Sequence, residues 1–317
     1  MMKKLLVVRN DKLGDLILIF PALKLIRNSI NDIQIDCLID KKFTDIRTIS
    51  NYIDNVICDN AQLVNEIKRS NYDFVISFFS TFNIGYKLYK SAIAKRYAPA
   101  TKLAQIFYNR TIKQNRSLSV KPEYEYNLDL AKYFLKDNGY NIYDSNSSYF
   151  SLTKTKDLSN EKKQSVFIHP YTGGSSKSLA PRDFIKLCEE INNYKECNFT
   201  IHCDVHDYDK CLKLEKINHN LNIKTINPTE SLIQMFDNIN KCDIFIAGST
   251  GPLHVAAALG KKTVGLYPSK ISSTSLRWST INPSHSKLSF TDIGNNNEYI
   301  EINLIKAARL IYDHLLD

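Results

Sequence analysis

The chain has 317 residues, of which 43% are hydrophobic and 24% charged, with a formal net charge of +9. This composition predicts an ordered protein long enough for two domains, and it excludes collagen-like and disordered chains. The seven cysteines are scattered without a Cys-x-x-Cys pair, which excludes a disulfide scaffold. The short apolar run Leu5–Val8 turns charged from Arg9 to Lys12, and the longest apolar stretch is interrupted by Pro21 and Lys24. We therefore expect a cytoplasmic protein without a secretory signal or membrane-spanning helix.

Short apolar runs alternate with segments of helical period in the first half of the chain. The expected strands are Lys4–Arg9, Ile33–Ile39, Asn55–Cys58 and Tyr72–Phe78. The first of them precedes a helix expected over Leu16–Ser29. This alternation is typical of βαβ units and predicts a mostly parallel sheet.

A polar stretch, Thr153 to Gln164, lacks apolar periodicity and predicts a linker. Beyond it the alternation restarts, with strands expected at Ser165–Ile168, Asn198–His202, Asn222–Ile226, Asp243–Ala247 and Thr263–Leu266. Helices are expected near 181–193, 207–217, 229–240 and 250–259, and from about Asn303 to Leu316. The sequence thus predicts two α/β domains that face a cleft, with ligands bound at the loops that follow the strands.

The first such loop runs from Asn10 to Asp15 and precedes the first helix. Gly14 allows a tight turn, and Asp15 falls at the start of the helix. Asp15 either caps the helix amides or serves as a general base in the cleft, and the sequence leaves both open. A dinucleotide fingerprint is excluded, because it needs three glycines where this loop has one.

The second loop, His169 to Lys177, contains two adjacent glycines, hydroxyl side chains that include Thr172, and a lysine. These groups suit a phosphate cradle, although the spacing is not that of a P-loop. A flexible polar loop is an equally good interpretation.

The third loop, Gly248 to His254, joins a strand to a helix whose first amides and dipole attract anions. His254 is a candidate donor to phosphate or, equally, an imidazole packed inside the protein. The segment from His202 to His206 matches no zinc pattern, and we expect no metal site.

Nine lysines or arginines and no acidic residue lie between Asp73 and Glu123. This segment predicts an anionic partner, or else only a solvated basic face. A non-enzymatic module that binds membrane or nucleic acid is a remote alternative, relying also on five aromatic residues, Tyr86, Tyr89, Tyr97, Phe107 and Tyr108. No recognised nucleic-acid motif is present, so we expect no nucleic-acid partner.

The three loops together resemble one family, the bacterial lipopolysaccharide heptosyltransferases of glycosyltransferase family nine. The resemblance is carried by three ordered motifs, Val8-Arg9 … Leu13-Gly14-Asp15 … Pro21-Ala22-Leu23, His169-Pro170 … Lys177 … Pro181, and Thr250-Gly251-Pro252-Leu253-His254 with the alanines 256–258. They span nearly the whole chain.

The resemblance implies a GT-B architecture with two Rossmann-like domains. Residues 1–155 would form the acceptor domain, residues 156–302 the nucleotide-sugar domain, and residues 303–317 a terminal helix that packs back on the first domain. It also implies an inverting, metal-independent enzyme without a cofactor. Such an enzyme would move a heptose from ADP-heptose to the lipopolysaccharide inner core, with lipid A–Kdo or a core oligosaccharide as acceptor, at the inner face of the inner membrane.

The resemblance and the loop chemistry assign a role to each candidate site residue. Asp15 is expected to be the base. The diphosphate is assigned to Thr172, Lys177, Thr250, Gly251 and His254, the donor sugar or nucleotide to Ser249 and Asp207, and the acceptor to Gly14, Lys95, Arg96 and Lys102.

Two positions depart from the family pattern. Ser249 stands where the family has Asp, and Leu179 stands where it often has Trp. The missing carboxylate leaves the donor sugar open, so the alternative is the same fold and mechanism with a different nucleotide sugar.

Overall fold

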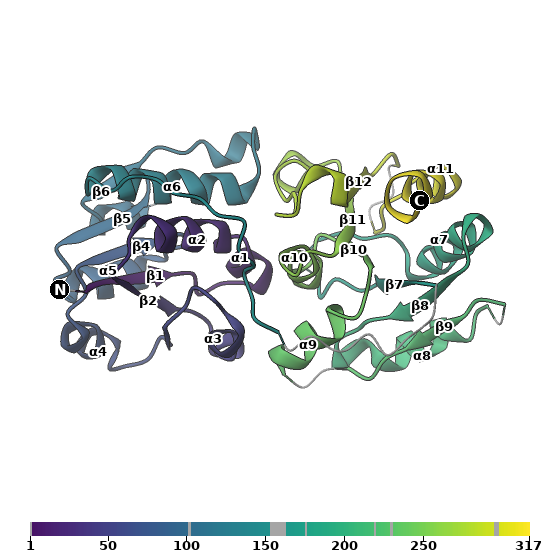
Figure 1. The fold of residues 1–317 in the computed structure, drawn as a ribbon, viewed down its shortest axis with the longest axis horizontal. Coiled ribbons are helices and arrows are strands. Elements are labelled where there is room, and N and C mark those ends of the chain that lie inside the picture. The colour runs from purple at the N-terminus through teal and green to yellow at the C-terminus, as the bar shows by residue number, and fades with distance from the viewer. Residues whose placement is uncertain are drawn as a thin grey trace. The chain divides into compact units, whose positions relative to one another are not determined.

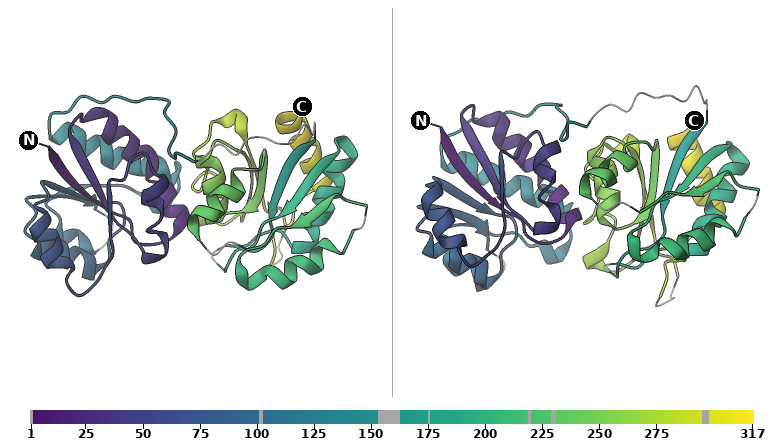
Figure 2. Two further views of the ribbon diagram at one scale, coloured as in Figure 1. Left: turned by 60° about the horizontal axis from the view of Figure 1, so that its bottom comes forward. Right: turned by 90° about the horizontal axis from the view of Figure 1, so that it is seen from below.

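The computed structural model describes residues 2–100, 103–152, 163–174, 176–218, 220–228, 231–294 and 298–317. The chain divides into two compact units, Met1–Ser151 and Leu152–Asp317, each built on a six-stranded sheet (Figure 1; Figure 2). Most of the expected linker lies outside the described residues, and its last residue, Gln164, already belongs to a strand.

The first unit is a doubly wound sheet with helices on both faces. Its strands are β1 (Lys3–Val8), β2 (Ile33–Leu38), β3 (Asn55–Ile57), β4 (Phe74–Ser77), β5 (Lys95–Pro99) and β6 (Arg110–Ile112). Its helices are α1 (Leu13–Ile17), α2 (Phe20–Ser29), α3 (Ile46–Ile49), α4 (Leu63–Ser70), α5 (Phe82–Lys90) and α6 (Glu123–Asp137), with 3-10 turns η1 (Lys41–Phe43), η2 (Leu103–Phe107) and η3 (Arg116–Leu118). The sheet order is β3-β2-β1-β4-β5-β6 with every pair parallel, which is the Rossmann order.

The first-unit sheet buries both faces. Leu6, Val8 and Val75 pack with Ile67 of α4 and Leu88 of α5 on one face. On the other face Phe74 contacts Phe134 of α6, and α6 packs against α2. Strands buried on both faces contain continuous apolar runs, which is why β1 and β4 were predictable.

The first-unit predictions need two corrections. The helix expected over Leu16–Ser29 is two helices, because Pro21 lies in the first turn of α2, where a residue without an amide hydrogen begins a helix more readily than it continues one. Strands β5 and β6 were not predicted, and both lie inside the basic segment.

The second unit repeats the same topology. Its strands are β7 (Gln164–His169), β8 (Cys197–Ile201), β9 (Ile223–Thr225), β10 (Ile244–Gly248), β11 (Lys262–Tyr267) and β12 (Lys287–Thr291). Its helices are α7 (Pro181–Tyr194), α8 (Tyr208–Glu215), α9 (Leu232–Ile239), α10 (Gly251–Ala258) and α11 (Leu304–Ile311), with short turns η4 (Val205–Asp207), η5 (Ile271–Ser273), η6 (Ser284–Ser286) and a π-helical end, η7 (Tyr312–Leu316). The parallel order β12-β11-β10-β7-β8-β9 is the Rossmann order seen from the other end. Five expected strands are confirmed, and β12 was not predicted.

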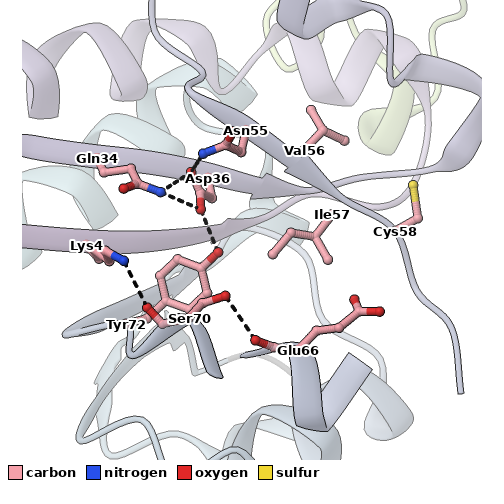
Figure 3. Close-up of a pocket in the computed structure, with 10 residues that line it drawn as sticks. All are labelled: Lys4, Gln34, Asp36, Asn55, Val56, Ile57, Cys58, Glu66, Ser70 and Tyr72. Atoms are coloured by element: carbon pink, nitrogen blue, oxygen red, sulfur yellow. Dashed lines mark hydrogen bonds between the residues drawn. The ribbon is translucent and has the colours of Figure 1, made fainter. Parts of the chain in front are cut away.

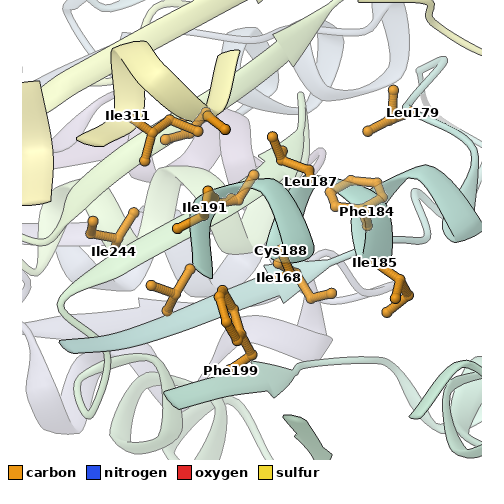
Figure 4. Close-up of a cluster of buried hydrophobic side chains, with 14 of the residues drawn as sticks. Ile168, Leu179, Phe184, Ile185, Leu187, Cys188, Ile191, Phe199, Ile244 and Ile311 are labelled. Atoms are coloured by element: carbon orange, nitrogen blue, oxygen red, sulfur yellow. The ribbon is translucent and has the colours of Figure 1, made fainter. Parts of the chain in front are cut away.

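The terminal helix contributes to the core of the second unit. Figure 4 shows Ile311 of α11 in the same buried cluster as Leu187 and Ile191 of α7. The apolar face of α11 packs against α7, because Ala308 and Ile311 lie on the stripe that faces it. That the terminal helix also packs on the first domain stays a prediction.

The expected class, two Rossmann-like α/β units, is confirmed. Within the ranges listed above, the structure contains no helix with the length and apolar character needed to cross a bilayer.

Candidate functional site

In each unit the strand order reverses at one point, between β1 and β4 and between β7 and β10. Connections leave the sheet in opposite directions there, so a crevice opens outside the carboxyl ends of those strands. All three loops singled out in the sequence follow β1, β7 or β10. The topology therefore places each predicted loop at a switch point of its own unit.

At the first-unit switch point a buried arginine holds two carboxylates. Arg9 directly follows β1, and its side chain is only 3% exposed. Its Nε lies 2.8 Å from Oδ1 of Asp11, and its Nη2 is bonded to Oδ1 of Asp15. Nη1 donates to the carbonyl of Phe78, which follows β4, at 3.2 Å. One cation thus ties together both strands of the switch point and both acidic side chains.

Asp15 lies in the first turn of α1, and its carboxylate forms an ion pair with Arg9. Its side chain therefore does more than lie at the start of the helix. The turn expected at Gly14 is not there, because Gly14 already belongs to α1 and is not among the residues with positive φ. Burial raises the pKa of Asp11 to about 6, with Arg9 opposing this rise and Asp15 adding to it.

Sequence reasoning had not assigned a role to Asp11, and it had used Arg9 only as part of a motif. The signal that points to both is an arginine at the end of the first strand, followed by aspartates two and six positions later.

At the second-unit switch point the loops after β7 and β10 touch. A Cβ at Gly248 would lie 2.8 Å from Ser178 Oγ and 3.2 Å from Thr172 Cγ2, so only glycine allows this approach. Gly173 and Gly174 have φ of 51° and 77°, which favours glycine at both places. The Thr172 hydroxyl donates to the Ser176 carbonyl at 2.7 Å and closes the loop on itself.

Two buried hydroxyls at this junction have no hydrogen-bond partner among the residues described. They are Ser178 Oγ, beside Gly248, and Thr250 Oγ1, at the N-terminal cap of α10. Ser249 is half-buried directly after β10, and Gly251 is the first residue of α10. Orphaned hydroxyls next to free helix amides suit an anionic ligand.

Lys177 and His254 belong to the same two loops. Lys177 is half-buried and directly precedes Ser178. His254 lies in the first turn and a half of α10, and its side chain is buried. The structure therefore brings the segments that carry five predicted donor residues, Thr172, Lys177, Ser249, Thr250 and Gly251, to one end of one sheet.

Two further histidines lie at the same edge of the second sheet. Nδ1 of His169, the last residue of β7, donates to the carbonyl of His202 at 2.9 Å, and the two Nδ1 atoms are 3.2 Å apart. Both rings are buried. Burial lowers both pKa values, that of His202 to about 3 with His169 contributing, so both imidazoles are neutral at ordinary pH.

Asp207, expected near the nucleotide, is linked to the loop after β7. It forms an ion pair with Lys210 at 2.8 Å, and the Lys210 ammonium lies 5.3 Å from the ring centre of Tyr171. A cavity of about 510 Å³ opens beside these side chains, lined also by Arg182, Lys213 and Tyr299.

Two of the cations expected at the acceptor, Lys95 and Arg96, do not share one face of the first-unit sheet. Lys95 and Arg96 are neighbours in β5, where successive side chains point to opposite faces. Lys95 Nζ donates to Asn138 Oδ1 at 2.7 Å, whereas Arg96 Nε donates to the Phe107 carbonyl at 2.8 Å. Lys102 lies outside the described residues.

Acidic residues from elsewhere in the first unit balance much of this charge. The ion pairs are Lys87–Asp59, Arg110–Asp137, Arg116–Glu123 and Lys121–Asp129. Two of the five aromatics of the binding-module alternative, Tyr97 and Tyr108, are buried. In the described part of the segment, the five aromatics of that alternative therefore do not form one exposed strip.

A polar cavity of about 440 Å³ opens in the first unit beside β1, β2 and β3. Figure 3 shows the residues that line it. Its groups bond to one another, since the Asp36 carboxylate accepts hydrogen bonds from Gln34, Asn55 and Tyr72. We assign this cavity a structural role. In the described parts of both units, no three His, Cys, Asp or Glu side chains are grouped so that they would hold a metal ion.

Comparison with known protein sequences finds relatives over the whole chain. The family described as "Glycosyltransferase family 9 (heptosyltransferase)" matches residues 60–300. A Haemophilus influenzae protein named "Putative glycosyltransferase" is 31% identical over 324 residues, which cover 96% of this chain and 93% of that protein. The loop that carries Asp15 lies before the family match.

Solved structures share the fold. Escherichia coli ADP-heptose lipopolysaccharide heptosyltransferase II has a TM-score of 0.78 at 13% identity, covering 99% of both chains. E. coli heptosyltransferase WaaC with ADP has a TM-score of 0.77 at 16% identity, covering 98% of this chain and 99% of that one. A family 9 glycosyl transferase from Veillonella parvula has a TM-score of 0.78 at 15% identity, covering 99% and 97%.

Proposed function

Because the chain belongs to glycosyltransferase family 9, we propose that it is an inverting, metal-independent enzyme that moves a heptose from ADP-heptose to the inner core of lipopolysaccharide. The acceptor is lipid A–Kdo or a core oligosaccharide that already carries heptose. In this proposal the first unit supplies the base and the second unit binds the donor.

The junction of the loops after β7 and β10 carries the proposal. Among the described residues, Ser178 Oγ beside Gly248 and Thr250 Oγ1 at the N-terminal cap of α10 are buried without hydrogen-bond partners. A diphosphate offers oxygen acceptors for both hydroxyls and for the amides, and Lys177 from the adjoining loop adds a positive charge. As the donor bond breaks, negative charge grows on this diphosphate, and preorganised donors stabilise it without a metal.

The first unit provides the proton acceptor. The acceptor hydroxyl loses its proton to Asp15 while its oxygen forms the bond to the anomeric carbon. The bond from that carbon to the phosphate oxygen breaks, and its electron pair leaves with ADP. Arg9 fixes the Asp15 carboxylate in one orientation, since its guanidinium is buried and also held by the Phe78 carbonyl.

A different nucleotide sugar is the second candidate donor, and Ser249 favours it. The residue follows β10 directly, next to Thr250, where the sugar attached to the diphosphate would lie. A serine there offers one hydroxyl where the family pattern offers a carboxylate.

A donor panel tests both candidates. Purified full-length protein is given a lipid A–Kdo acceptor and each of several ADP-, UDP- and GDP-sugars, and transfer is followed by mass spectrometry with and without a chelator. We expect transfer from ADP-heptose that survives the chelator. Transfer from another sugar alone would select the second candidate, and binding of no nucleotide sugar would contradict both.

We also propose that the protein works at the inner face of the inner membrane, and that an aromatic surface of the first unit makes this contact. The aromatic surface consists of Phe82, Tyr86, Tyr89, Leu103 and Ile106, which are 44 to 82% exposed. Phe82, Tyr86 and Tyr89 surround the ring of Phe107. The Lys90 ammonium and the Arg96 guanidinium lie over Tyr86 and Tyr89 at its border. Apolar side chains bordered by cations suit the headgroup region of anionic lipids.

Liposome co-sedimentation tests the aromatic surface. The double change Leu103→Ser and Ile106→Ser should lower partitioning to anionic vesicles at least about tenfold, because each buried apolar side chain contributes 1.5 kcal/mol or more. The matched control is Ile293→Ser with Ile305→Ser, two equally exposed residues of the second unit. If high salt abolishes binding and the double change leaves it intact, the contact is purely electrostatic, as the basic segment in the sequence predicts.

A further inference from the structure

Asp11 is a second carboxylate on the guanidinium that holds Asp15, and the transfer mechanism above does not use it. The Asp11 and Asp15 side chains are 17% and 15% exposed, and Arg9 between them is almost fully buried. The contact of Asp11 with Arg9 Nε is an ion pair whose geometry falls short of a linear hydrogen bond. The two carboxylates therefore contact neighbouring nitrogens of the same cation, Asp11 at Nε and Asp15 at Nη2.

One cation cannot neutralise two carboxylates. Burial raises the pKa of Asp11 to about 6, Arg9 opposes the rise, and Asp15 adds to it. Arg9, which follows β1, and Asp15 of α1 are charged groups that act on Asp11. The residues that follow β4 contribute the Phe78 carbonyl and the Phe79 ring, which face Arg9. Burial and the like charge of Asp15 therefore favour the protonated form of Asp11, whereas Arg9 favours its ionised form.

We propose that Asp11 is a positioning residue that shares Arg9 with Asp15 and thereby keeps Asp15 ready to accept the proton of the acceptor hydroxyl. This inference rests on the proposed role of Asp15 as the base. When Asp11 is ionised, it takes part of the attraction of Arg9, and the Asp15 carboxylate retains its affinity for a proton. When Asp11 is protonated or removed, Arg9 acts on Asp15 alone, and proton transfer from the acceptor to Asp15 becomes less favourable.

The pH dependence of sugar transfer tests the inference. In the wild-type protein kcat should decline below about pH 6. Asp11→Asn should move this decline to lower pH by one unit or more and reduce kcat at pH 7.5 about tenfold, with the donor KM changed less than twofold, since the loss concerns the proton-transfer step. Asp11→Glu should restore the wild-type profile in part. Asp40→Asn, a carboxylate that follows β2 of the same sheet and caps η1, is the control.

A second measurement does not depend on activity. Carbon-13 NMR of the aspartate carboxyls in the full-length protein should show one group that titrates near pH 6, that disappears in Asp11→Asn and shifts in Asp15→Asn. Wild-type transfer with an unchanged pH profile in Asp11→Asn would overturn the inference and leave the proposed function standing. Failure of every donor would contradict the proposed function, and the NMR titration would still decide whether the carboxylates share Arg9. If Asp11→Asn does not fold, the same profile and titration in Asp11→Glu decide the question.

Discussion

The two switch points of this protein have the same strand order and opposite chemistry. In the first unit, three charged side chains share one centre, Arg9, Asp11 and Asp15, and one carboxylate takes up a proton more readily than usual. In the second unit the same place holds glycines, hydroxyls, the start of α10 and two buried neutral imidazoles. The fold fixes where a ligand binds, and the residues after the strands decide what it does there.

The difference fits a division of labour in group transfer. A base needs a carboxylate whose charge is shared, so that it still accepts a proton. A site for a diphosphate must supply donors and avoid added negative charge, and the described loops after β7 and β10 contain no Asp or Glu. The predictions below test this division from the largest expected effect to the smallest.

Asp15→Asn tests the first-unit side. Turnover should fall by roughly a hundredfold or more, the scale of a lost general base, because the amide cannot accept the acceptor proton. Donor affinity should stay within about twofold, since the donor belongs to the second unit. Steady-state kinetics with calorimetry of donor binding measure both. Wild-type turnover in this variant would mean that Asp15 only caps the helix start. A large loss of donor affinity would contradict the division of base and donor site between the two units.

Lys177→Ala tests the second-unit side. A charge-assisted hydrogen bond to phosphate contributes about 1.5 to 3 kcal/mol, so kcat/KM should fall roughly ten- to a hundredfold. Lys186→Ala is the control, because this lysine lies on the exposed side of α7 in the same unit. The pH profile of transfer should be unchanged in Lys177→Ala. Activity equal to that of the control variant would remove Lys177 from the site.

The central strands were predictable from sequence because most of their residues are buried, and the edge strands β3 and β9 were also predicted although they are not buried. β1, β4, β7 and β10 are central strands and read as apolar runs. β6 and β12 lie at sheet edges, and β5 is next to an edge. Their sequences (RTI, KLSFT and KRYAP) are short, charged or end in proline, so tertiary pairing and not local pattern makes them strands.

The candidate site likewise has parts that could be predicted from the sequence and parts that could not. Glycine and hydroxyl loops are local in sequence, so the segments that carry Thr172, Lys177 and Thr250 could be recognised before their contacts were known. The pairing of Arg9 with Asp11, the approach of Ser178 to Gly248 and the contact between His169 and His202 depend on the folded chain. The basic segment predicted an exposed cationic surface because no acidic residue lies within it. The acidic residues that pair with its cations are distant in sequence or follow the segment.

The pH dependence of stability should have opposite signs in the two units. His202 has a pKa of about 3 when folded against 6.5 unfolded, so as pH falls below 6.5 the unfolded state gains a proton and stability is lost, by at most about 2 kcal/mol at pH 5. Asp11 has a pKa of about 6 when folded against 3.8 unfolded. Stability therefore rises as pH falls from 6 towards 3.8, by about 1 kcal/mol at pH 5.

Denaturant unfolding at pH 7.5 and 5.0 measures these slopes. The single tryptophan, Trp278, reports on the second unit, and circular dichroism reports on the whole chain. His202→Gln should reduce the loss of stability at pH 5.0 that Trp278 reports, and Asp11→Asn should remove the gain of stability in the first unit. His285→Gln, at an exposed position, is the control. Equal slopes in all variants would mean that neither centre carries the proton linkage described here.

Ser249→Asp makes the second-unit site resemble the family pattern and has the smallest expected effect. A carboxylate at this position would accept hydrogen bonds from sugar hydroxyls, and charge-assisted bonds are about twice as strong as neutral ones. If the natural donor is ADP-heptose, its affinity should rise by about 1 kcal/mol, or roughly fivefold. If the protein uses another sugar, the change should leave ADP-heptose unused and weaken binding of the true donor, because an unpaired charge would lie beside it.

Donor affinity and turnover across the nucleotide-sugar panel, with Ser249→Ala as the control for the hydroxyl, separate these outcomes. No effect on any donor would show that position 249 does not touch the sugar, and the specificity would then have to come from residues outside the loop after β10.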